Sequence, residues 1–314
     1  MQFDVGTELA ARYGLDPELC AGAQIGDQPW QRAPYFVRSP GPKPPVTLAT
    51  LRIKSWHNFG NLVYQLLHAL AFAEEQGVPA ISGPSLPWFR NGTVAGVALA
   101  LGEPFKRPAL VGHYFYPQPL GLDEPFRRAH LVRGLRELFD VGADDRPAPP
   151  VNGEMVVHLR SGDVFGDDPH PGYWPPALGY YTAAIADAAP SAVRLVCQDR
   201  VHPLLDPLER WGRDHGLPVA VQVSDDLRAD LATLTSATTL CISQGTLGLA
   251  SAWLSVSAER VYLPRGAHTE ELRALGTTVV EAAVPAPPEP WQASPEQVAG
   301  LVMGADPVRL QVVS

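Results

Sequence analysis

The second half of the chain alternates short apolar runs with amphipathic stretches of helical period. The apolar runs predict buried strands at 154–159, 193–197, 218–223, 239–242 and 260–263. Helices are expected at 176–189, 204–215, 226–237 and 246–254. Strands that alternate with helices across short turns indicate a parallel sheet with right-handed crossovers. We therefore predict an α/β unit whose last strand is 260–263.

The first half of the chain is less regular. Residues 46–53 predict a strand, 55–61 a polar turn that contains glycine, and the following residues a helix that ends near Gly77. Another helix is expected at 125–139, after short apolar segments broken by glycine and proline. This pattern predicts a second βα-containing unit.

Polar and proline-rich stretches divide the chain into domains. The segment Ser39-Pro-Gly-Pro-Lys-Pro-Pro45 sustains neither a helix nor a central strand, and 142–150 is the best interdomain linker. The expected parts are an N-terminal arm at 1–45, α/β domains at 46–145 and 151–275, and a proline-rich segment with a C-terminal helix at 276–314.

Composition and charge limit the function classes. With 314 residues, 46% of them hydrophobic, the chain is long enough for a sizeable core. No apolar run approaches the about 20 residues of a membrane-spanning helix, and the N-terminus lacks the features of a signal peptide. We expect a cytoplasmic protein without a transmembrane segment. The net charge of -9 argues against nucleic acid as a partner.

The cysteine and aspartate patterns do not predict a metal site. The three cysteines are widely spaced, at Cys20, Cys197 and Cys241. The last two lie in apolar runs, so buried reduced thiols are expected instead of a disulfide or a metal site. Asp163, Asp167 and Asp168 are expected to shape a loop, because aspartate favours turns and no second ligand cluster accompanies them.

The first candidate for chemistry lies at the end of the strand at 154–159. His158 and Arg160 share one face, because side chains alternate along a strand. The carboxyl ends of parallel strands are where α/β sheets present groups to ligands. A half-buried arginine keeps its charge and requires an anionic or carbonyl partner. Two interpretations stay open here: Arg160 binds a ligand, or it pairs with Asp163 to hold a loop.

The second candidate is the segment Ile242-Ser-Gln-Gly-Thr-Leu-Gly248, between a predicted strand and a predicted helix. Its turn residues are Ser243, Gln244, Gly245 and Thr246. A helix N-terminus offers unpaired N–H groups and partial positive charge to a phosphate, although serine and threonine also cap helices without a ligand. The segment has neither the lysine of a Walker A loop nor the G-x-G-x-x-G spacing.

In one parallel sheet, Arg160 and the 243–246 turn are expected to converge on one crevice. A guanidinium beside a helix N-terminus suits a diphosphate, with about 1.5–3 kcal/mol for each charge-assisted hydrogen bond. In a transfer from a nucleotide sugar, the diphosphate is the leaving group. The same contacts then strengthen as the bond breaks, as catalysis requires.

Three segments resemble one enzyme superfamily. His158-Leu-Arg-Ser-Gly-Asp163, with His170-Pro-Gly-Tyr173 and Tyr180-Tyr181 after it, looks like the His-x-Arg region of the GDP-fucose-dependent α1,2/α1,6 and protein O-fucosyltransferases. Phe59-Gly-Asn-Leu-Val-Tyr-Gln65 is similar to the N-terminal Gly-Asn turn of that superfamily. Asp225, Asp226 and the 243–246 turn resemble its C-terminal motif. The segments occur in the expected order and span about residues 46–265.

The resemblance implies a GT-B fold, with two Rossmann-like domains whose parallel sheets face each other across a cleft. It implies an inverting fucosyltransferase that uses GDP-fucose, with no essential metal and no cofactor. The partners would be this nucleotide sugar and a glycan or small-molecule acceptor. One departure is Ser161, which stands where the α1,2 and α1,6 branches usually carry a second basic residue.

The same resemblance assigns roles to residues. Arg160 would hold the β-phosphate and the 243–246 turn the pyrophosphate. Asp199 would lie near the nucleoside, and His158 and Asp226 would complete the donor side. The domain before the linker would be the acceptor side, with Asn58, Gly60 and Asn61 facing the acceptor. His57 is the nearest candidate for the general base, because histidine titrates near neutrality unaided. A hydrogen-bonded loop histidine is the alternative.

Two other functions stay open. One is a polysaccharide pyruvyltransferase-like enzyme, whose family also begins with a Gly-Asn turn and a helix, although the Arg160 motif argues against it. The other is a protein that binds nucleotide sugars without catalysis, because no carboxylate in the Gly-Asn turn is an obvious base.

Overall fold

The computed structural model describes residues 2–3, 35–37, 50–53, 58–86, 88–104, 109–112, 114, 129–141, 153–224, 226–265, 269–285, 289–304 and 308–313. The chain forms two compact units, residues 1–140 and 141–314. The predicted linker at 142–150 lies outside the described residues.

The first unit is built on one mixed sheet with the strand order β1-β2-β7-β3-β4-β6-β5. Its strands are β1 (Gln2–Phe3), β2 (Tyr35–Val37), β3 (Thr50–Ile53), β4 (Ala80–Gly83), β5 (Gly92–Val94), β6 (Val97–Leu101) and β7 (Ala109–Gly112). The four central strands, β7, β3, β4 and β6, run parallel to one another. The remaining three pair antiparallel at the two edges.

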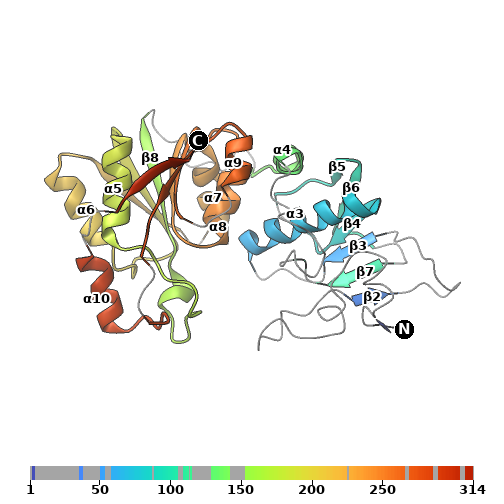
Figure 1. Ribbon diagram of the computed structural model, residues 1–314, viewed down its shortest axis with the longest axis horizontal. Helices are drawn as coiled ribbons and strands as arrows, with labels where there is room; N and C mark the ends of the chain where they lie inside the picture. Colours follow the sequence, from blue (N-terminus) through green and yellow to red (C-terminus); the bar gives the residue numbers. More distant parts are fainter. Residues whose placement is uncertain are drawn as a thin grey trace, which may run out of the picture. The chain divides into compact units, whose positions relative to one another are not determined.

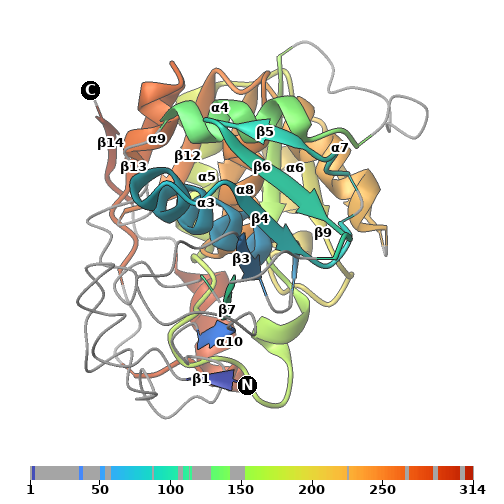
Figure 2. The same ribbon diagram turned by 90° about the vertical axis from the view of Figure 1, so that its right-hand side faces the viewer.

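Helix α3 (Phe59–Gln76) follows β3 and packs along the sheet, with α4 (Ala129–Leu138) beside it (Figure 2). The predicted apolar face of α3 is buried, and the helix ends at Gly77 in the left-handed conformation, with φ at +65°. Its polar residues Gln65 and His68 are buried too. They bond the backbone of Tyr114, whose N–H donates to Gln65 Oε1 and whose carbonyl accepts from His68 Nδ1.

The second unit contains a seven-stranded sheet of the order β10-β9-β8-β11-β12-β13-β14. Its strands are β8 (Glu154–Leu159), β9 (Ala192–Cys197), β10 (Val219–Val223), β11 (Thr239–Ile242), β12 (Arg260–Pro264), β13 (Thr278–Ala282) and β14 (Leu310–Val313). Only β14 pairs antiparallel. Its helices are the 3-10 helix η3 (Gly162–Phe165), α5 (Leu178–Ala188), α6 (Leu205–Asp214), α7 (Leu227–Ser236), α8 (Thr246–Leu254), α9 (Glu270–Ala274) and α10 (Pro295–Met303).

These elements confirm the predicted α/β class and correct one detail. The expectation that 260–263 is the last strand is wrong, because β13 and β14 extend the same sheet beyond it. A proline-rich stretch separates the two strands along the chain, so the sequence pattern does not indicate that they pair. The apolar segments at 80–111 form four strands of the first sheet.

The strand order places a switch point between β8 and β11. From β8 the chain builds outward through β9 and β10, then crosses back to β11 and builds in the other direction. Helices α5 and α6 cover one face of this sheet, and α7 and α8 cover the other (Figure 1). Loops at the carboxyl ends of the two strands beside such a switch point diverge, which opens a crevice for ligands.

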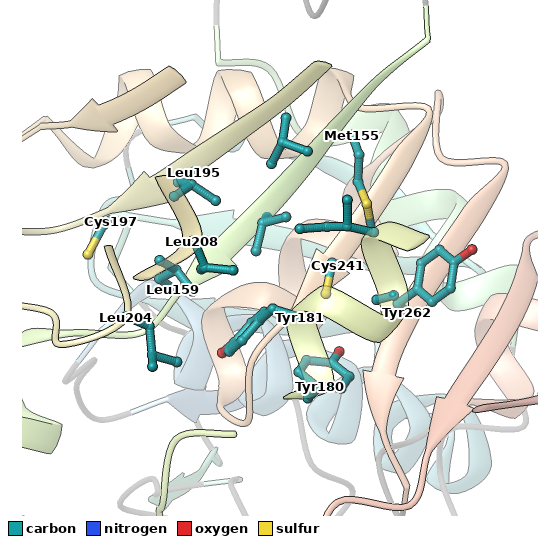
Figure 3. Packing of buried hydrophobic residues seen from close by; sticks show 14 of the residues in the cluster. Met155, Leu159, Tyr180, Tyr181, Leu195, Cys197, Leu204, Leu208, Cys241 and Tyr262 are labelled. Carbon is teal, nitrogen blue, oxygen red and sulfur yellow. The ribbon is translucent and has the colours of Figure 1, made fainter. Parts of the chain in front are cut away.

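One face of the β8 sheet packs a continuous core against α5 and α6 (Figure 3). Met155, Val157 and Leu159 of β8 point into it, together with Tyr180 and Tyr181 of α5. The Tyr180 hydroxyl donates to the carbonyl of Ile242 at the end of β11, 2.8 Å away. Helix α5 therefore supports the strand end from which the second candidate segment begins.

Two predictions about single features can be compared with the described residues. Cys197 and Cys241 are buried free thiols, as expected, and burial raises the pKa of Cys241 to about 12. Cys20 lies outside the described part of the chain. Among the helices described, none combines the length and the hydropathy that a membrane span requires.

Candidate functional site

The structure brings the two predicted segments together at the switch point. Ile242, the last residue of β11, pairs with His158 of β8. The residues that follow therefore lie side by side, and the backbone N–H of Arg160 donates to Ser243 Oγ across 3.3 Å. Both segments emerge at the carboxyl edge of the sheet, where an open α/β fold binds its ligands.

Gly245 lets the turn approach the Arg160 side chain closely. Its φ is +136°, and a Cβ atom built on it would lie 2.7 Å from Arg160 Nη1 and 3.1 Å from Arg160 Cδ. Any side chain at this position would be strained and would displace the guanidinium. The glycine therefore permits the contact between Arg160 and the start of α8.

The start of α8 is suited to an anion. Its first turn, Thr246-Leu247-Gly248, carries no acidic residue, and its N-cap residue is Gly245, which has no side chain to cap it. Gly248 keeps this turn against the strands, because a Cβ there would lie 3.0 Å from His158 Nδ1. The partial positive charge of the helix N-terminus thus lies beside the full charge of Arg160.

Arg160 is held by two residues of the loop that follows β8. Its Nη2 donates to Asp163 Oδ2 across 2.8 Å, and its guanidinium carbon lies 4.6 Å from the centre of the Tyr173 ring. The Arg160 side chain is 20% exposed and that of Asp163 69%. The pairing with Asp163 that the sequence left open is therefore present, but it leaves the guanidinium accessible to a ligand.

Asp199 organises this loop from the loop that follows the neighbouring strand β9. Its carboxylate accepts from Ser161 Oγ at 2.6 Å, from the backbone N–H of Gly162 at 3.2 Å and from that of Val201 at 3.1 Å. Ser161 is buried, so its hydroxyl serves this contact. A long basic side chain at this position would lose this hydrogen bond.

Two histidines are buried behind Arg160. Burial, together with smaller effects of the nearby Arg160 and His202, lowers the pKa of His158 to about 4. Burial also lowers the pKa of His202 to about 4, against an opposing effect of Asp199. Ser243 Oγ lies 3.4 Å from His158 Nδ1. Both imidazoles are neutral at pH 7, so Arg160 supplies the positive charge of this site.

The remaining donor-side predictions have local partners. Asp226 caps α7, with its carboxylate accepting from the backbone N–H of Arg228 at 2.9 Å, and Asp225 lies outside the described residues. Gln244, in the turn before α8, and Thr246, the first residue of that helix, are half-buried, and Ser243 is buried. Ser243 therefore joins the tips of the two strands, while Gln244 and Thr246 are more accessible.

The predicted acceptor-side residues belong to the first unit. Asn58 caps α3, with its side-chain oxygen accepting from the backbone N–H of Asn61 at 2.9 Å. Gly60 is buried and Asn61 half-buried in the first turn of that helix. His57 lies outside the described residues. The amide of Asn58 therefore has a structural role at the start of α3.

Two residues near the site were missed by sequence reasoning, and a third, Tyr173, was quoted in the resemblance without a role at Arg160. Tyr173 and His202 lie in loops after β8 and β9, where no periodicity marks them. Asp230 is buried on α7, where its Oδ1 accepts from Gln222 and where burial raises its pKa to about 6. The sequence signal that could have found Asp230 is its position one helical turn after Asp226, which places both carboxylates on the same side of α7. In the described part of the chain, no group of three or more His, Cys, Asp or Glu residues is arranged to hold a metal ion.

Comparison with known proteins finds similarity in structure alone. No family model matches the chain, and no curated protein matches its sequence. A crystal structure of POFUT1 with GDP-fucose is 12% identical, with a TM-score of 0.45, and the match covers 69% of this chain and 98% of that one. The iron-containing dodecameric glycosyltransferase TibC from enterotoxigenic E. coli H10407 is 15% identical over 69% of this chain and 58% of its own, with a TM-score of 0.40. A family 9 glycosyl transferase from Veillonella parvula DSM 2008 is 8% identical over 83% and 98%, with a TM-score of 0.34.

Proposed function

We propose that this protein is an inverting glycosyltransferase that transfers fucose from GDP-fucose to a hydroxyl of a glycan or a small molecule. One observation carries the proposal: the Arg160 guanidinium lies against Gly245 at the N-terminus of α8, at the switch point of the sheet. A fixed charge and a helix N-terminus at one strand edge form a site for a diphosphate. The resemblance of the Arg160 and 243–246 segments to the fucosyltransferases supplies the identity of the donor.

The reaction uses this site to stabilise the leaving group. The acceptor hydroxyl attacks the anomeric carbon of the sugar, the bond from that carbon to the diphosphate oxygen breaks, and negative charge accumulates on the β-phosphate. Arg160 and the N-terminus of α8 stabilise that charge more strongly in the transition state than in the bound donor. A general base takes the proton of the hydroxyl, and His57 is our candidate for it.

The other residues of the site hold these groups in place. Ser243 joins the two strand tips, and Asp199 fixes the loop that begins at Ser161. We propose that Gln244 and Thr246 contact the diphosphate and that Asp226 belongs to the donor side. Since two groups of the chain neutralise the diphosphate, we expect transfer to proceed without a metal.

The test measures sugar transfer and GDP release with GDP-fucose and a panel of acceptors. We expect Arg160→Ala to lower turnover by about 10²-fold, the usual cost of removing one donor that stabilises developing charge. The control is Arg213→Ala on the surface of α6, which removes an arginine from the same unit without touching the site. Equal turnover in the Arg160 variant and the wild type would overturn the assignment.

Three further measurements separate this function from the alternatives. Thermal stabilisation by GDP and GDP-fucose, but not by UDP- or dTDP-sugars or phosphoenolpyruvate, supports the proposed donor and excludes pyruvyl transfer. Release of GDP that requires an acceptor distinguishes catalysis from binding alone. Activity that disappears with EDTA and returns with a divalent cation would contradict transfer without a metal.

A further inference from the structure

The loop that holds Arg160 is itself held by a distant residue, Trp291. This residue lies in the C-terminal segment between β13 and α10. It is 2% exposed and belongs to the core of the second unit. Sequence reasoning placed it only in a proline-rich segment, with no connection to the site.

Trp291 bonds the loop at two places. Its indole Nε1–H donates to the carbonyl of Val164 at 2.8 Å, and its backbone N–H donates to the carbonyl of Pro171 at 3.2 Å. Its ring also meets that of Phe165 edge-on, with 6.1 Å between the ring centres. One buried residue therefore fixes both ends of the exposed stretch at 166–170.

These two places adjoin the two side chains that contact Arg160. Asp163 directly precedes Val164, and Tyr173 lies two residues after Pro171. The backbone of the loop thus has little freedom where it presents the Asp163 carboxylate and the Tyr173 ring to the guanidinium. Without these hydrogen bonds the loop would have more conformations available, and so would Arg160.

We infer that Trp291 is a positioning residue for the anion site: it holds the loop after β8 so that Asp163 and Tyr173 keep the Arg160 guanidinium beside the N-terminus of α8. The C-terminal segment thus supports the site indirectly, through the contacts of Trp291 with Val164, Phe165 and Pro171. This inference rests on the proposed function for its ligand, but the positioning itself concerns only this chain.

The test compares Trp291→Phe, which keeps an aromatic ring and removes the indole donor, with the wild type. The first readout is the NMR signal of the Arg160 Nε–H group without ligand, assigned by its loss in Arg160→Gln. Stacking on Tyr173 shifts this signal, so we expect Trp291→Phe to move it toward the value of a free arginine. A second variant, Phe165→Leu, removes the ring contact with Trp291 from the side of the loop, and we expect it to move the same signal. This variant replaces Trp291→Phe in the test if Trp291→Phe does not fold.

The second readout is the dissociation constant of GDP. We expect Trp291→Phe to weaken binding by about 2- to 10-fold, the loss that one net hydrogen bond corresponds to. In the Arg160→Gln background the same substitution should cause no further loss, because its effect passes through Arg160. The matched control is Tyr262→Phe, which removes a 2.6 Å hydrogen bond to Asp187 elsewhere in the unit and should change neither readout.

The outcomes separate this inference from the proposed function. An Arg160 Nε–H signal that stays unchanged in both Trp291→Phe and Phe165→Leu would overturn the positioning role, whatever the protein binds. An equal loss of GDP affinity with and without Arg160 would also overturn it, since the tryptophan would then act on stability alone. A wild type that binds no GDP, with the Arg160 signal shifted as expected, would overturn the proposed donor and support the positioning role.

Discussion

Strand β8 has an arginine–carboxylate pair at each of its ends, and the two pairs differ in almost every physical respect. At the amino end, Arg194 of β9 grips Glu154 with two hydrogen bonds, from Nε at 3.1 Å and from Nη2 at 3.0 Å. These side chains are 15% and 5% exposed. At the carboxyl end, Arg160 meets Asp163 through Nη2, and the aspartate is mostly exposed.

The difference separates a structural pair from a binding site. The pair at the amino end is desolvated and bidentate, and each charge there requires the other. At the carboxyl end the arginine has further contact capacity, lies beside a helix N-terminus and stays partly accessible. An arginine–carboxylate pair therefore holds two strands together at one end of β8. At the other end, in our proposal, the arginine of the pair binds a diphosphate.

The largest expected effect comes from breaking the amino-end pair. Arg194→Met leaves the Glu154 carboxylate buried without this partner, and we expect a loss of about 3–5 kcal/mol in the free energy of unfolding. Chemical denaturation measures it. Arg160→Met should cost at most about 1 kcal/mol, because its partner is exposed. For GDP affinity we expect the opposite order, with the larger loss in Arg160→Met. If folded Arg194→Met lost as much GDP affinity as Arg160→Met, the comparison of the two pairs would be contradicted.

A second, smaller effect is expected at Gly245. Gly245→Ala places a Cβ against Arg160 in a strained backbone conformation, and we expect about 1–3 kcal/mol of lost stability together with weaker GDP binding. The matched control is Gly216→Ala after α6, where φ is +67° and no atom lies within 4 Å of the added carbon. If both variants bind GDP like the wild type, the close approach at Gly245 has no role in the site.

Acid should destabilise the protein through two buried histidines, His158 at the end of β8 and His202 in the loop after β9. The pKa values of His158 and His202 fall from 6.5 to about 4 on folding, so between these values the unfolded chain binds more protons. Stability therefore decreases as the pH falls from 6.5 to 4. Asp230 opposes this, because burial raises its pKa from 3.8 to about 6 and the folded state then binds the extra proton.

Unfolding measured across this pH range in the wild type and in His202→Gln tests the source of the effect. We expect the variant to reduce the slope by as much as about 1.4 kcal/mol per pH unit, the contribution of one proton. Asp230→Asn should make the slope steeper. An unchanged slope in His202→Gln would assign the acid sensitivity to other groups.

The smallest expected effect concerns the exposed partner of Arg160. Asp163→Asn weakens the contact that orients the guanidinium, and we expect GDP binding to weaken by about 2- to 5-fold, in line with the small energies of exposed ion pairs. Titration calorimetry measures the change. Tighter binding in the variant would instead mean that Asp163 competes with the diphosphate for Arg160.

Most of the second unit could be predicted from the sequence, because its strands are nearly continuous apolar runs and its helices are amphipathic. The same reasoning brought Arg160 and the 243–246 turn to one sheet edge, since both follow parallel strands. It failed for β13 and β14, which a proline-rich stretch separates along the chain. It also gave Tyr173 no contact with Arg160 and did not find His202 or Trp291, because these contacts depend on loops and on residues far apart in the chain.

The most direct test of the central claim is the affinity of GDP for the wild type and for Arg160→Gln, measured by titration calorimetry. Our account predicts that the wild type binds GDP and that the variant binds it about 10-fold or more weakly, the value of one charge-assisted hydrogen bond. Equal affinities, or a wild type that does not bind GDP, would contradict the claim that Arg160 and the start of α8 hold a diphosphate.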